Sequence, residues 1–255
     1  MKSLILSALM LSAAALSIAP AAAQTLPAGT AKNVVLVHGA FADETGWANV
    51  AAILSAKGYT VTAVKNPLTS LADDVAATKA VLDAQDGPTV LVGHSWGGVV
   101  IGEAGDNANV SALVYVSAFA PDKGESLGAL AEGGPQTEGL KKIVPDAKGF
   151  LSIDPAAFPA VFAADVPKAE AEAMAANQLP INSTAFGEAA AVAAWHDKPT
   201  WYAVTAKDLM IDPAAQGFFS QRMGATTVTI DGSHASYISH PEDVAALIES
   251  AAAAK

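Results

Sequence analysis

Apolar runs rich in β-branched residues recur along most of the chain and alternate with segments of helical spacing. Their short length is typical of strands, expected at 33–37, 59–64, 89–92, 110–117, 200–205 and 225–230. The run at 89–92 has the continuous apolar pattern of a strand that is buried on both faces, whereas 59–64 alternates. The segments between the early runs repeat apolar residues every three or four positions, at 47–57, 70–82 and from residue 99 onward. This alternation predicts an α/β fold with a doubly wound, mostly parallel sheet.

The alternation stops between residues 123 and 198. Apolar helical stretches in this block contain no clear strand and are interrupted by five prolines, Pro145, Pro155, Pro159, Pro167 and Pro180. A stretch of about 75 residues is too long for a loop in a compact domain. We therefore expect a helical cap at 123–198, inserted into a core that is formed by residues 31–122 and 199–255.

The first 23 residues have the pattern of a signal peptide. Lys2 precedes an apolar run from Leu4 to Ala19, and residues 21–23 provide the small residues of a cleavage site. The run is marginal in length for a membrane span, and a retained anchor is the alternative. We expect cleavage after Ala23, export to the periplasm or the medium, and no stable membrane insertion after cleavage.

Charge and composition exclude several classes of partner and chemistry. The 25 acidic residues outnumber the 14 lysines and arginines, which gives a formal net charge of −11 without a basic cluster. Nucleic acids and anionic lipids are therefore poor partners, and a small-molecule substrate is expected. Because the sequence contains no cysteine, disulfides and a thiol nucleophile are excluded.

The stretch VLVGHSWGG, residues 90–98, combines the end of a strand with a glycine-rich turn. Gly93 and Gly97 flank Ser95 at two-residue spacing, and a helical pattern begins soon after. A sharp strand-to-helix turn needs small residues at these two positions, and it exposes the central hydroxyl at the sheet edge. Such a turn also directs the backbone N–H groups of the helix start at the atom that the serine attacks. Ser95 is therefore the candidate nucleophile.

A serine nucleophile needs a base, and the chain has five histidines. His234 follows the expected strand at 225–230, so it lies at the carboxyl edge of the sheet, where chemistry gathers in open parallel sheets. His240 is the alternative, although the segment from Ser239 to Glu242 fits a capping box of the last helix. His38 and His94 lie in turns, and His196 ends the cap.

Two aspartates leave strands at the same edge and are candidates to orient the base. Asp208 follows the expected strand at 200–205, in a loop that gives it no evident structural role. Asp122 lies in the stretch PDKG, whose residue types are those of a turn, so a role in that turn is enough to explain this aspartate. Asp212 precedes Pro213 and fits a helix cap. Asp208 is preferred, because the chain order Ser95, Asp208, His234 is the order expected of one large α/β fold.

From about residue 31 to its end, the chain resembles the α/β-hydrolase family, and especially its small esterases and the group of plant methyl-ester esterases and hydroxynitrile lyases. The resemblance rests on four segments, His38–Phe41, Gly93–Gly98, the loop with Asp208, and Ser233–His234. It implies a Ser-His-Asp triad beneath a helical cap. The lyases of this group carry a lysine directly after the triad histidine, whereas this chain has Ala235, so cyanohydrin cleavage is disfavoured.

The resemblance also implies an oxyanion hole formed by the backbone N–H groups of Ala40 and Trp96. The local patterns agree, because Trp96 follows the nucleophile at a helix start and Ala40 lies in a glycine-containing turn after the first strand. The side chains of Phe41 and Trp96 either line a substrate pocket or belong to the core. The sequence pattern leaves both interpretations open.

We expect a serine hydrolase that cleaves a small uncharged carboxylic ester through an acyl-enzyme, with Ser95, Asp208 and His234 as its catalytic residues. This chemistry needs no metal ion and no organic cofactor. The alternatives on the same fold are an acyltransferase and a cofactor-free peroxidase. A protein that binds a small ligand under its cap without turnover is a further alternative, because fold alone does not define function.

Overall fold

The computed structural model describes residues 26–254, so the expected signal peptide, residues 1–23, lies outside the described part. A six-stranded sheet with the order β2-β1-β3-β4-β8-β9 forms the centre of the molecule, and all its neighbouring strands are parallel. The strands are β1 (Asn33–Val37), β2 (Thr60–Val64), β3 (Thr89–His94), β4 (Val110–Val116), β8 (Thr200–Thr205) and β9 (Thr226–Ile230). The predicted parallel sheet is confirmed.

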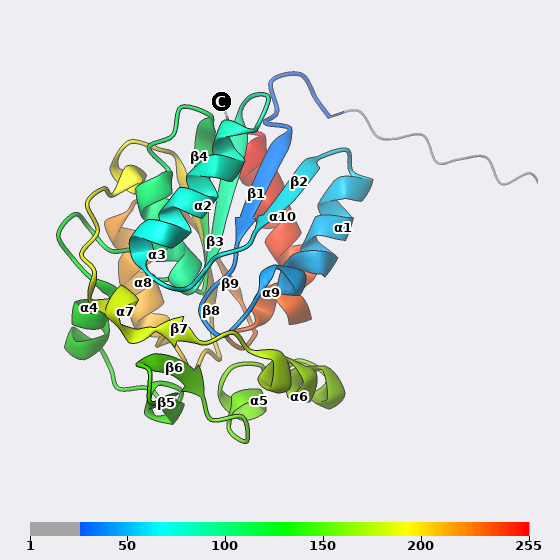
Figure 1. Cartoon of the computed structure of the whole chain (residues 1–255). Helices are drawn as coiled ribbons and strands as arrows, with labels where there is room; N and C mark the ends of the chain where they lie inside the picture. The colour runs from blue at the N-terminus through cyan, green and yellow to red at the C-terminus, as the bar shows by residue number, and fades with distance from the viewer. Residues whose placement is uncertain (1–25, 255) are drawn as a thin grey trace, which may run out of the picture.

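Helices cover both faces of this sheet (Figure 1). One face is covered by α1 (Ala48–Ala56) and α10 (Pro241–Ala252), which pack against each other. The other face is covered by α2 (Leu71–Asp83), α3 (Trp96–Ala104) and α8 (Pro213–Arg222). The short helices η1 (Glu44–Trp47) and α9 (Ser236–Ser239) follow β1 and β9. The arrangement is the doubly wound α/β fold that the sequence predicts.

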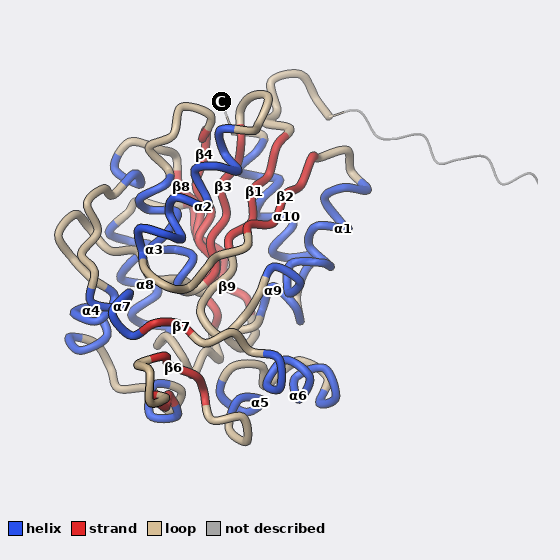
Figure 2. The backbone as a smooth tube through the Cα atoms, viewed as in Figure 1, coloured by secondary structure: helices blue, strands red, loops and turns tan. Residues whose placement is uncertain are grey.

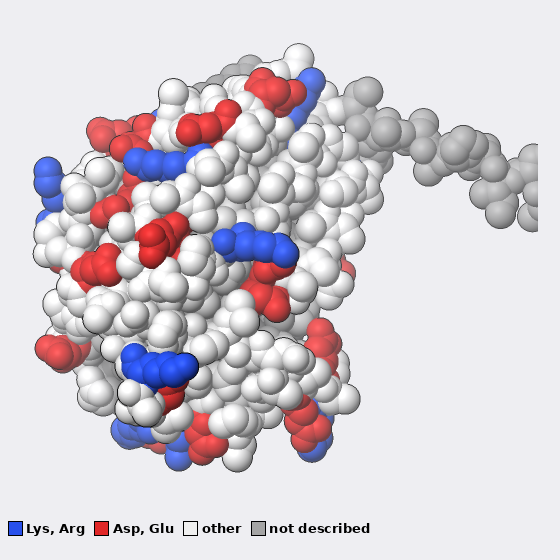
Figure 3. All heavy atoms as spheres, viewed as in Figure 1, with Lys and Arg blue, Asp and Glu red and all other residues white. Residues whose placement is uncertain are grey.

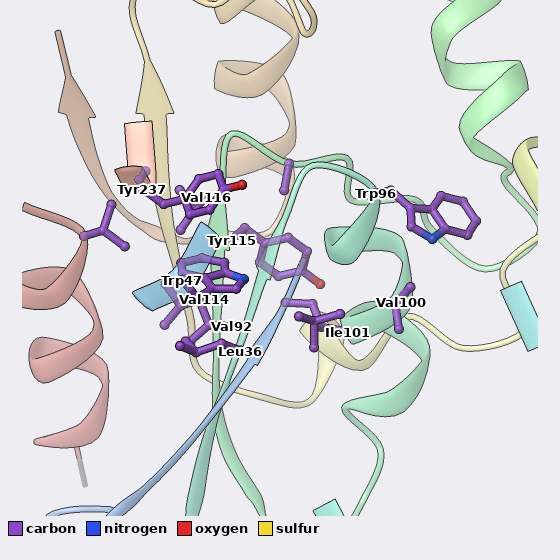
Figure 4. Close-up of a cluster of buried hydrophobic side chains, with 14 of the residues drawn as sticks. Leu36, Trp47, Val92, Trp96, Val100, Ile101, Val114, Tyr115, Val116 and Tyr237 are labelled. Carbon is purple, nitrogen blue, oxygen red and sulfur yellow. The ribbon is translucent and has the colours of Figure 1, made fainter. Parts of the chain in front are cut away.

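The core lies between the sheet and its helices because the central strands are apolar on both faces. Every residue of β1 and β3 is buried, and Leu36, Val92 and Val114 are fully enclosed (Figure 4). Trp47 and Tyr237 pack with their ring centroids 4.6 Å apart. Burying one such side chain contributes about 1.5–3 kcal/mol relative to leaving it exposed. The core therefore fixes the edge from which the turn with Ser95 leaves.

Residues 123–187 form a layer beyond the carboxyl ends of the strands (Figure 1). Its helices are α4 (Leu127–Gly133), η2 (Leu140–Lys142), α5 (Phe158–Val161), α6 (Lys168–Asn177) and α7 (Ser183–Gly187), whereas η3 (Ala194–His196), on the way back to β8, packs against α3. They are accompanied by a small antiparallel sheet of β5 (Ile143–Pro145), β6 (Phe150–Ile153) and β7 (Ile181–Asn182). Figure 2 shows β6 and β7 among these helices.

The expectation of a purely helical cap is therefore wrong in one respect, since the layer includes this three-stranded sheet. The strands have only three, four and two residues. Segments this short carry no measurable period in the sequence. Moreover, β7 is paired with β6 across the whole of α5 and α6, and such long-range pairing leaves no local pattern.

The surface agrees with the acidic composition. On the face shown in Figure 3, acidic side chains are spread among uncharged ones, and basic side chains lie singly or next to acidic ones without forming a continuous patch. No helix within residues 26–254 is both long enough and apolar enough to cross a membrane.

Candidate active site

Ser95 occupies the sharp turn between β3 and α3. Its φ of 53° and ψ of −118° lie in a region that residues other than glycine rarely adopt. A Cβ added to Gly93 would lie 2.4 Å from the Gly97 carbonyl oxygen, and one added to Gly97 would lie 2.5 Å from the Val37 carbonyl oxygen. The close backbone approach on both sides of Ser95 thus explains the two glycines that the sequence motif places there.

Gly93→Ala is expected to destabilise the fold, because the added methyl group would overlap backbone atoms that cannot rotate away. Overpacking of this kind costs typically about 1–3 kcal/mol. Urea unfolding measures the loss. The control is Gly217→Ala in α8, where an added Cβ meets no atom within 4 Å and helix propensity favours alanine by about 1 kcal/mol. Equal stability of the two variants would contradict the close approach at Gly93.

Asp208 and His234 form a buried pair at the same edge of the sheet. Asp208 lies in the loop after β8, His234 follows β9, and His234 Nδ1 is 2.8 Å from Asp208 Oδ2. Both side chains are shielded from solvent. The sequence analysis preferred Asp208 to Asp122 as the partner of the histidine, and the structure brings Asp208 to it.

The Asp208 carboxylate accepts hydrogen bonds from four further groups. The N–H groups of Met210 and Ile211 donate to Oδ1 over 2.7 and 3.0 Å. Gln216 Nε2 and Thr205 Oγ1 donate to Oδ2 over 2.8 and 3.1 Å. A carboxylate that accepts from donors on both oxygens has a single allowed orientation, which fixes the position of the oxygen that faces His234.

Three other groups hold the loop that carries His234. The ring of His94 donates its Nε2–H to the His234 carbonyl oxygen over 2.9 Å, and the two rings lie with centroids 4.6 Å apart. Burial lowers the pKa of His94 well below its usual value, so this ring is uncharged. From the cap, the Phe162 carbonyl oxygen accepts from the Ala235 N–H, and Asp165 accepts from Ser233. Core and cap together position this loop.

No hydrogen bond joins Ser95 Oγ to His234 within residues 26–254. His94, which precedes Ser95 in the chain, contacts His234 through both its ring and its Nε2, so Ser95 and His234 lie at the same edge of the sheet. In structures without substrate, hydrogen bonds between nucleophile and base are often long and shorten only in the complex. The Nδ1 atom of the His234 imidazole is held by the Asp208 carboxylate.

The backbone N–H groups of Ala40 and Trp96 are unpaired among the described residues. Trp96 is the first residue of α3, where backbone donors have no partner inside the helix. The turn with Ala40 lies against Ser95, since a Cβ added to Gly39 would be 2.8 Å from the Ser95 Cβ. Phe41 has a φ of 64°, a strained value for a bulky residue. The two free donors flank the serine.

His38 holds the turn that carries Ala40. Its Nε2 accepts from the Asn66 N–H over 3.1 Å, so its Nδ1 carries the proton and donates to the Gly39 carbonyl oxygen over 2.9 Å. Burial lowers the pKa of this histidine below its usual value. His38 is therefore an uncharged residue that positions the loop.

A cavity of about 30 Å³ lies over Ser95, bordered by the side chains of Phe41, Trp96, Phe119 and their apolar neighbours. Phe41 and Trp96 are also 4% and 1% exposed, as core residues are. Both residues are thus packed in the core and also border the serine cavity, and their role in substrate binding stays a prediction.

Asp74 in α2 is a buried carboxylate next to the serine turn that the sequence analysis did not single out. Its Oδ2 accepts from the indole Nε1–H of Trp96 over 2.7 Å, and its Oδ1 accepts from the Leu68 N–H over 2.8 Å. Figure 4 shows the Trp96 side chain lying apart from the central apolar cluster. Burial raises the pKa of Asp74 to about 6, although both hydrogen bonds oppose the shift.

Asp74→Asn is expected to change how stability depends on pH. The folded-state pKa is raised above the ordinary value of 3.8, so the contribution of Asp74 is fully present below pH 3.8 and is lost as the pH rises through about 6. The free energy of unfolding of wild type minus that of the variant should therefore fall by up to about 3 kcal/mol from pH 4 to pH 7. Urea unfolding across this range measures it.

The control for this prediction is Asp83→Asn, at the exposed end of the same helix, which removes a carboxylate that bonds to Asn107. Its difference from wild type should stay nearly constant between pH 4 and pH 7. A constant difference for Asp74→Asn as well would show that the Asp74 carboxyl titrates at its ordinary pKa.

The remaining candidates from the sequence lie elsewhere. Asp122 pairs with His196 at the surface over 2.9 Å, and this contact lowers the pKa of Asp122. Asp212 caps α8 through the Ala214 N–H, as predicted. His240 lies 3.5 Å from Asp165. Among residues 26–254, no group of three or more His, Cys, Asp or Glu side chains is arranged to hold a metal ion.

The expected capping box at residues 239–242 is wrong. His240 immediately precedes α10, and no side chain caps that helix. Ser239 instead ends α9 and donates its hydroxyl to Asp165 of the cap over 3.0 Å. The helix begins at Pro241, so its N-cap position belongs to His240 and not to Ser239, and the spacing of the expected box does not match the helix start.

Gln216 and Asp165 are further residues of the site that the sequence analysis missed. Gln216 bonds to Asp208, and Asp165 bonds to the loop with His234. The only sequence signal for Gln216 was its polar side chain on an otherwise apolar face of the helix, where no nearby residue could pair with it. Asp165 carried no signal, since its partners are 68 and 74 residues away.

Comparison with known proteins agrees with this geometry. A model of the Alpha/beta hydrolase family matches residues 34–247. The chain belongs to this family. It is 29% identical over 237 residues to a probable hydrolase, R7, of Phoma sp., which covers 84% of this chain and 96% of that protein. It is 36% identical over 108 residues to Methylesterase 7 of Arabidopsis thaliana, over 36% of this chain and 41% of that one.

Among solved structures, the chain is similar to a pyrethroid hydrolase from Sphingobium faniae JZ-2. The TM-score is 0.77 at 23% identity, and the match covers 88% of this chain and 98% of that one. At this identity the likeness concerns the fold. The chain is thus an esterase-like hydrolase of the α/β-hydrolase family.

Proposed function

We propose that this protein is a serine hydrolase that cleaves a small uncharged carboxylic ester through an acyl-enzyme. The observation that carries the proposal is the buried Asp208–His234 pair beside the strained turn with Ser95. A serine hydroxyl is a weak nucleophile at neutral pH, and an imidazole held by a carboxylate is the common way to activate it. A backbone conformation as unusual as that of Ser95 persists where the surrounding structure enforces it, and such strain is common at active sites.

In the first half of the reaction, Ser95 Oγ attacks the ester carbonyl carbon while His234 Nε2 takes the hydroxyl proton. Asp208 keeps the proton on Nδ1 and stabilises the imidazolium that forms. The carbonyl oxygen becomes an oxyanion, which the N–H groups of Ala40 and Trp96 bind. His234 then returns the proton to the leaving alcohol, and the acyl group stays on Ser95.

In the second half, His234 removes a proton from water, which attacks the acyl-enzyme. The same two N–H groups bind the second oxyanion, and Ser95 leaves with the proton from His234. Apolar side chains surround the serine cavity. An uncharged ester is therefore preferred over a charged one, because burying an unpaired charge there is costly.

A lyase reaction on cyanohydrins is not part of the proposal. The residue after His234 is Ala235, which is fully buried and donates its N–H to Phe162. It offers no cation to a cyanide ion at that position.

Rapid mixing with p-nitrophenyl butyrate tests the mechanism. We expect a burst of p-nitrophenol with an amplitude near one per protein, and a mass increase of one butyryl group on the peptide with Ser95. Added alcohol separates hydrolysis from acyl transfer, since an acyltransferase gives mainly the new ester. Tight binding of the ester without release of p-nitrophenol would instead support a ligand-binding protein, and peroxide-dependent oxidation without ester cleavage would support a peroxidase.

A further inference from the structure

Two further apolar spaces lie next to the small cavity over Ser95, between the cap and α8. The first is a narrow space of about 20 Å³, and Phe119, Leu140, Met210 and Ile211 border both it and the cavity. The second is an open groove of about 400 Å³, which shares Leu130, Pro135, Ala215 and Phe219 with the narrow space. We call this row of three adjoining spaces the apolar channel.

The walls of the channel are almost wholly apolar. The only charged residue on its borders is Asp212, whose carboxylate accepts from the Ala214 N–H as the cap of α8. Phe218 lies at the open end and is 55% exposed, the largest value among the exposed large apolar side chains of the described residues. An exposed aromatic residue that borders a concave apolar groove marks a contact for an apolar ligand.

The narrow part of the channel is built on the loop that carries Asp208. Thr137 Oγ1 donates to the Met210 carbonyl oxygen over 3.0 Å, and the Gly139 N–H donates to the Leu209 carbonyl oxygen over 2.8 Å. Gly139 leaves room for the Met210 side chain, because a Cβ there would lie 2.3 Å from its sulfur. Methionine is flexible and unbranched, so it can move aside for a chain that passes from the groove to Ser95.

We propose that the apolar channel binds an unbranched alkyl chain of the ester, with the ester carbonyl at Ser95 and the chain directed between α4 and α8 toward Phe218. The inference rests on the proposed serine esterase function and adds its substrate class. The narrow part favours a linear chain over a ring or a branched chain, since the spaces of about 20 and 30 Å³ are far smaller than the groove beyond them.

A second cavity offers a matched control. It has a volume of about 300 Å³ and lies between α6 and the segment 41–49, and polar residues such as Asp43, Asn49 and Glu170 border it. Ala173 of α6 borders this second cavity, whereas Ala215 of α8 borders the channel. Both alanines lie in helices, so the same substitution by tryptophan can be made at each. Ala215→Trp fills part of the channel, and Ala173→Trp fills part of the second cavity.

The experiment measures kcat/KM for p-nitrophenyl esters from acetate to decanoate and for butyrate esters of alcohols from ethanol to decanol. In one of the two series, the kcat/KM of wild type should rise at least tenfold from the shortest to the longest chain. The series in which it rises tells whether the bound chain belongs to the acyl or to the alcohol part of the ester. Ala215→Trp should remove that gain and keep the shortest ester within threefold of wild type. Ala173→Trp should leave the series unchanged. Leu130→Trp, on the facing wall, replaces Ala215→Trp if that variant does not fold.

The channel is refuted if the wild type cleaves esters without regard to chain length, if Ala215→Trp keeps the gain, or if Ala173→Trp removes it. In these cases Ser95-dependent cleavage of the acetate ester still supports the proposed function. If no ester is cleaved, that function fails, and calorimetry with 1-decanol decides the channel separately. The channel is supported if wild type and Ala173→Trp bind 1-decanol at least tenfold more tightly than Ala215→Trp does. It is refuted if all three proteins bind 1-decanol equally well.

Discussion

Ser95→Ala is expected to lower ester turnover on the order of a millionfold, the usual result of losing a serine nucleophile that acts with its base. The variant lacks the only hydroxyl that the turn presents to the carbonyl carbon, while the two free N–H groups and His234 remain in place. Stopped-flow and steady-state assays with p-nitrophenyl butyrate measure the loss of turnover. The thermal transition should stay close to that of wild type, since alanine fits the same space at the same φ.

The matched control is Ser111→Ala, which removes a serine hydroxyl at the one exposed position of β4. Its turnover should stay within twofold of wild type. A folded Ser95→Ala protein that retains more than a few per cent of the activity would refute Ser95 as the nucleophile and, with it, the acyl-enzyme mechanism.

Asp208→Asn is expected to lower turnover roughly ten-thousandfold, because the amide puts His234 in the wrong tautomer. The two backbone N–H groups of Met210 and Ile211 require an oxygen at the Oδ1 position. The amide NH₂ group therefore takes the Oδ2 position and faces His234 Nδ1, which must then accept instead of donate. The proton moves to Nε2, where the imidazole no longer acts as a base toward Ser95.

Asp122→Asn is the control for this prediction. Asp122 is exposed and bonds to His196 at the surface, so its loss should change turnover by no more than about threefold, as is usual for surface substitutions that keep the fold. The opposite ranking of the two variants would move the orienting acid to the strand before the cap.

The strands and the serine turn could be predicted because their signals are local. The run from Asn33 to Val37 and that from Thr200 to Thr205 are observed with the predicted bounds. Buried parallel strands are continuous apolar runs that end at glycine or polar turns, so sequence alone defines them. Likewise, Gly93 precedes Ser95 because backbone atoms approach within the turn itself, whereas the space at Gly97 is limited by the distant Val37 carbonyl oxygen of β1.

The sequence favoured Asp208 as the partner of His234 through its context and the chain order, but only the tertiary structure gives the contact itself. Asp122 and Asp208 both leave strands at the carboxyl edge, and nothing local distinguishes the direction of their carboxylates. In the folded chain β8 lies between β4 and β9, which brings Asp208 within 2.8 Å of His234 and leaves Asp122 to His196. Strand order arises from long-range pairing, which the spacing of residues along the chain does not contain.

By itself, then, the sequence determined the alternating α/β core and the serine on its glycine-flanked turn. The tertiary structure alone decided the small sheet of the cap, the Asp74–Trp96 contact and the support that Gln216 gives Asp208. The physical reason is the same in each case. A buried polar group is stable only with a partner, and these partners lie on elements that meet only when the sheet, its helices and the cap have packed together.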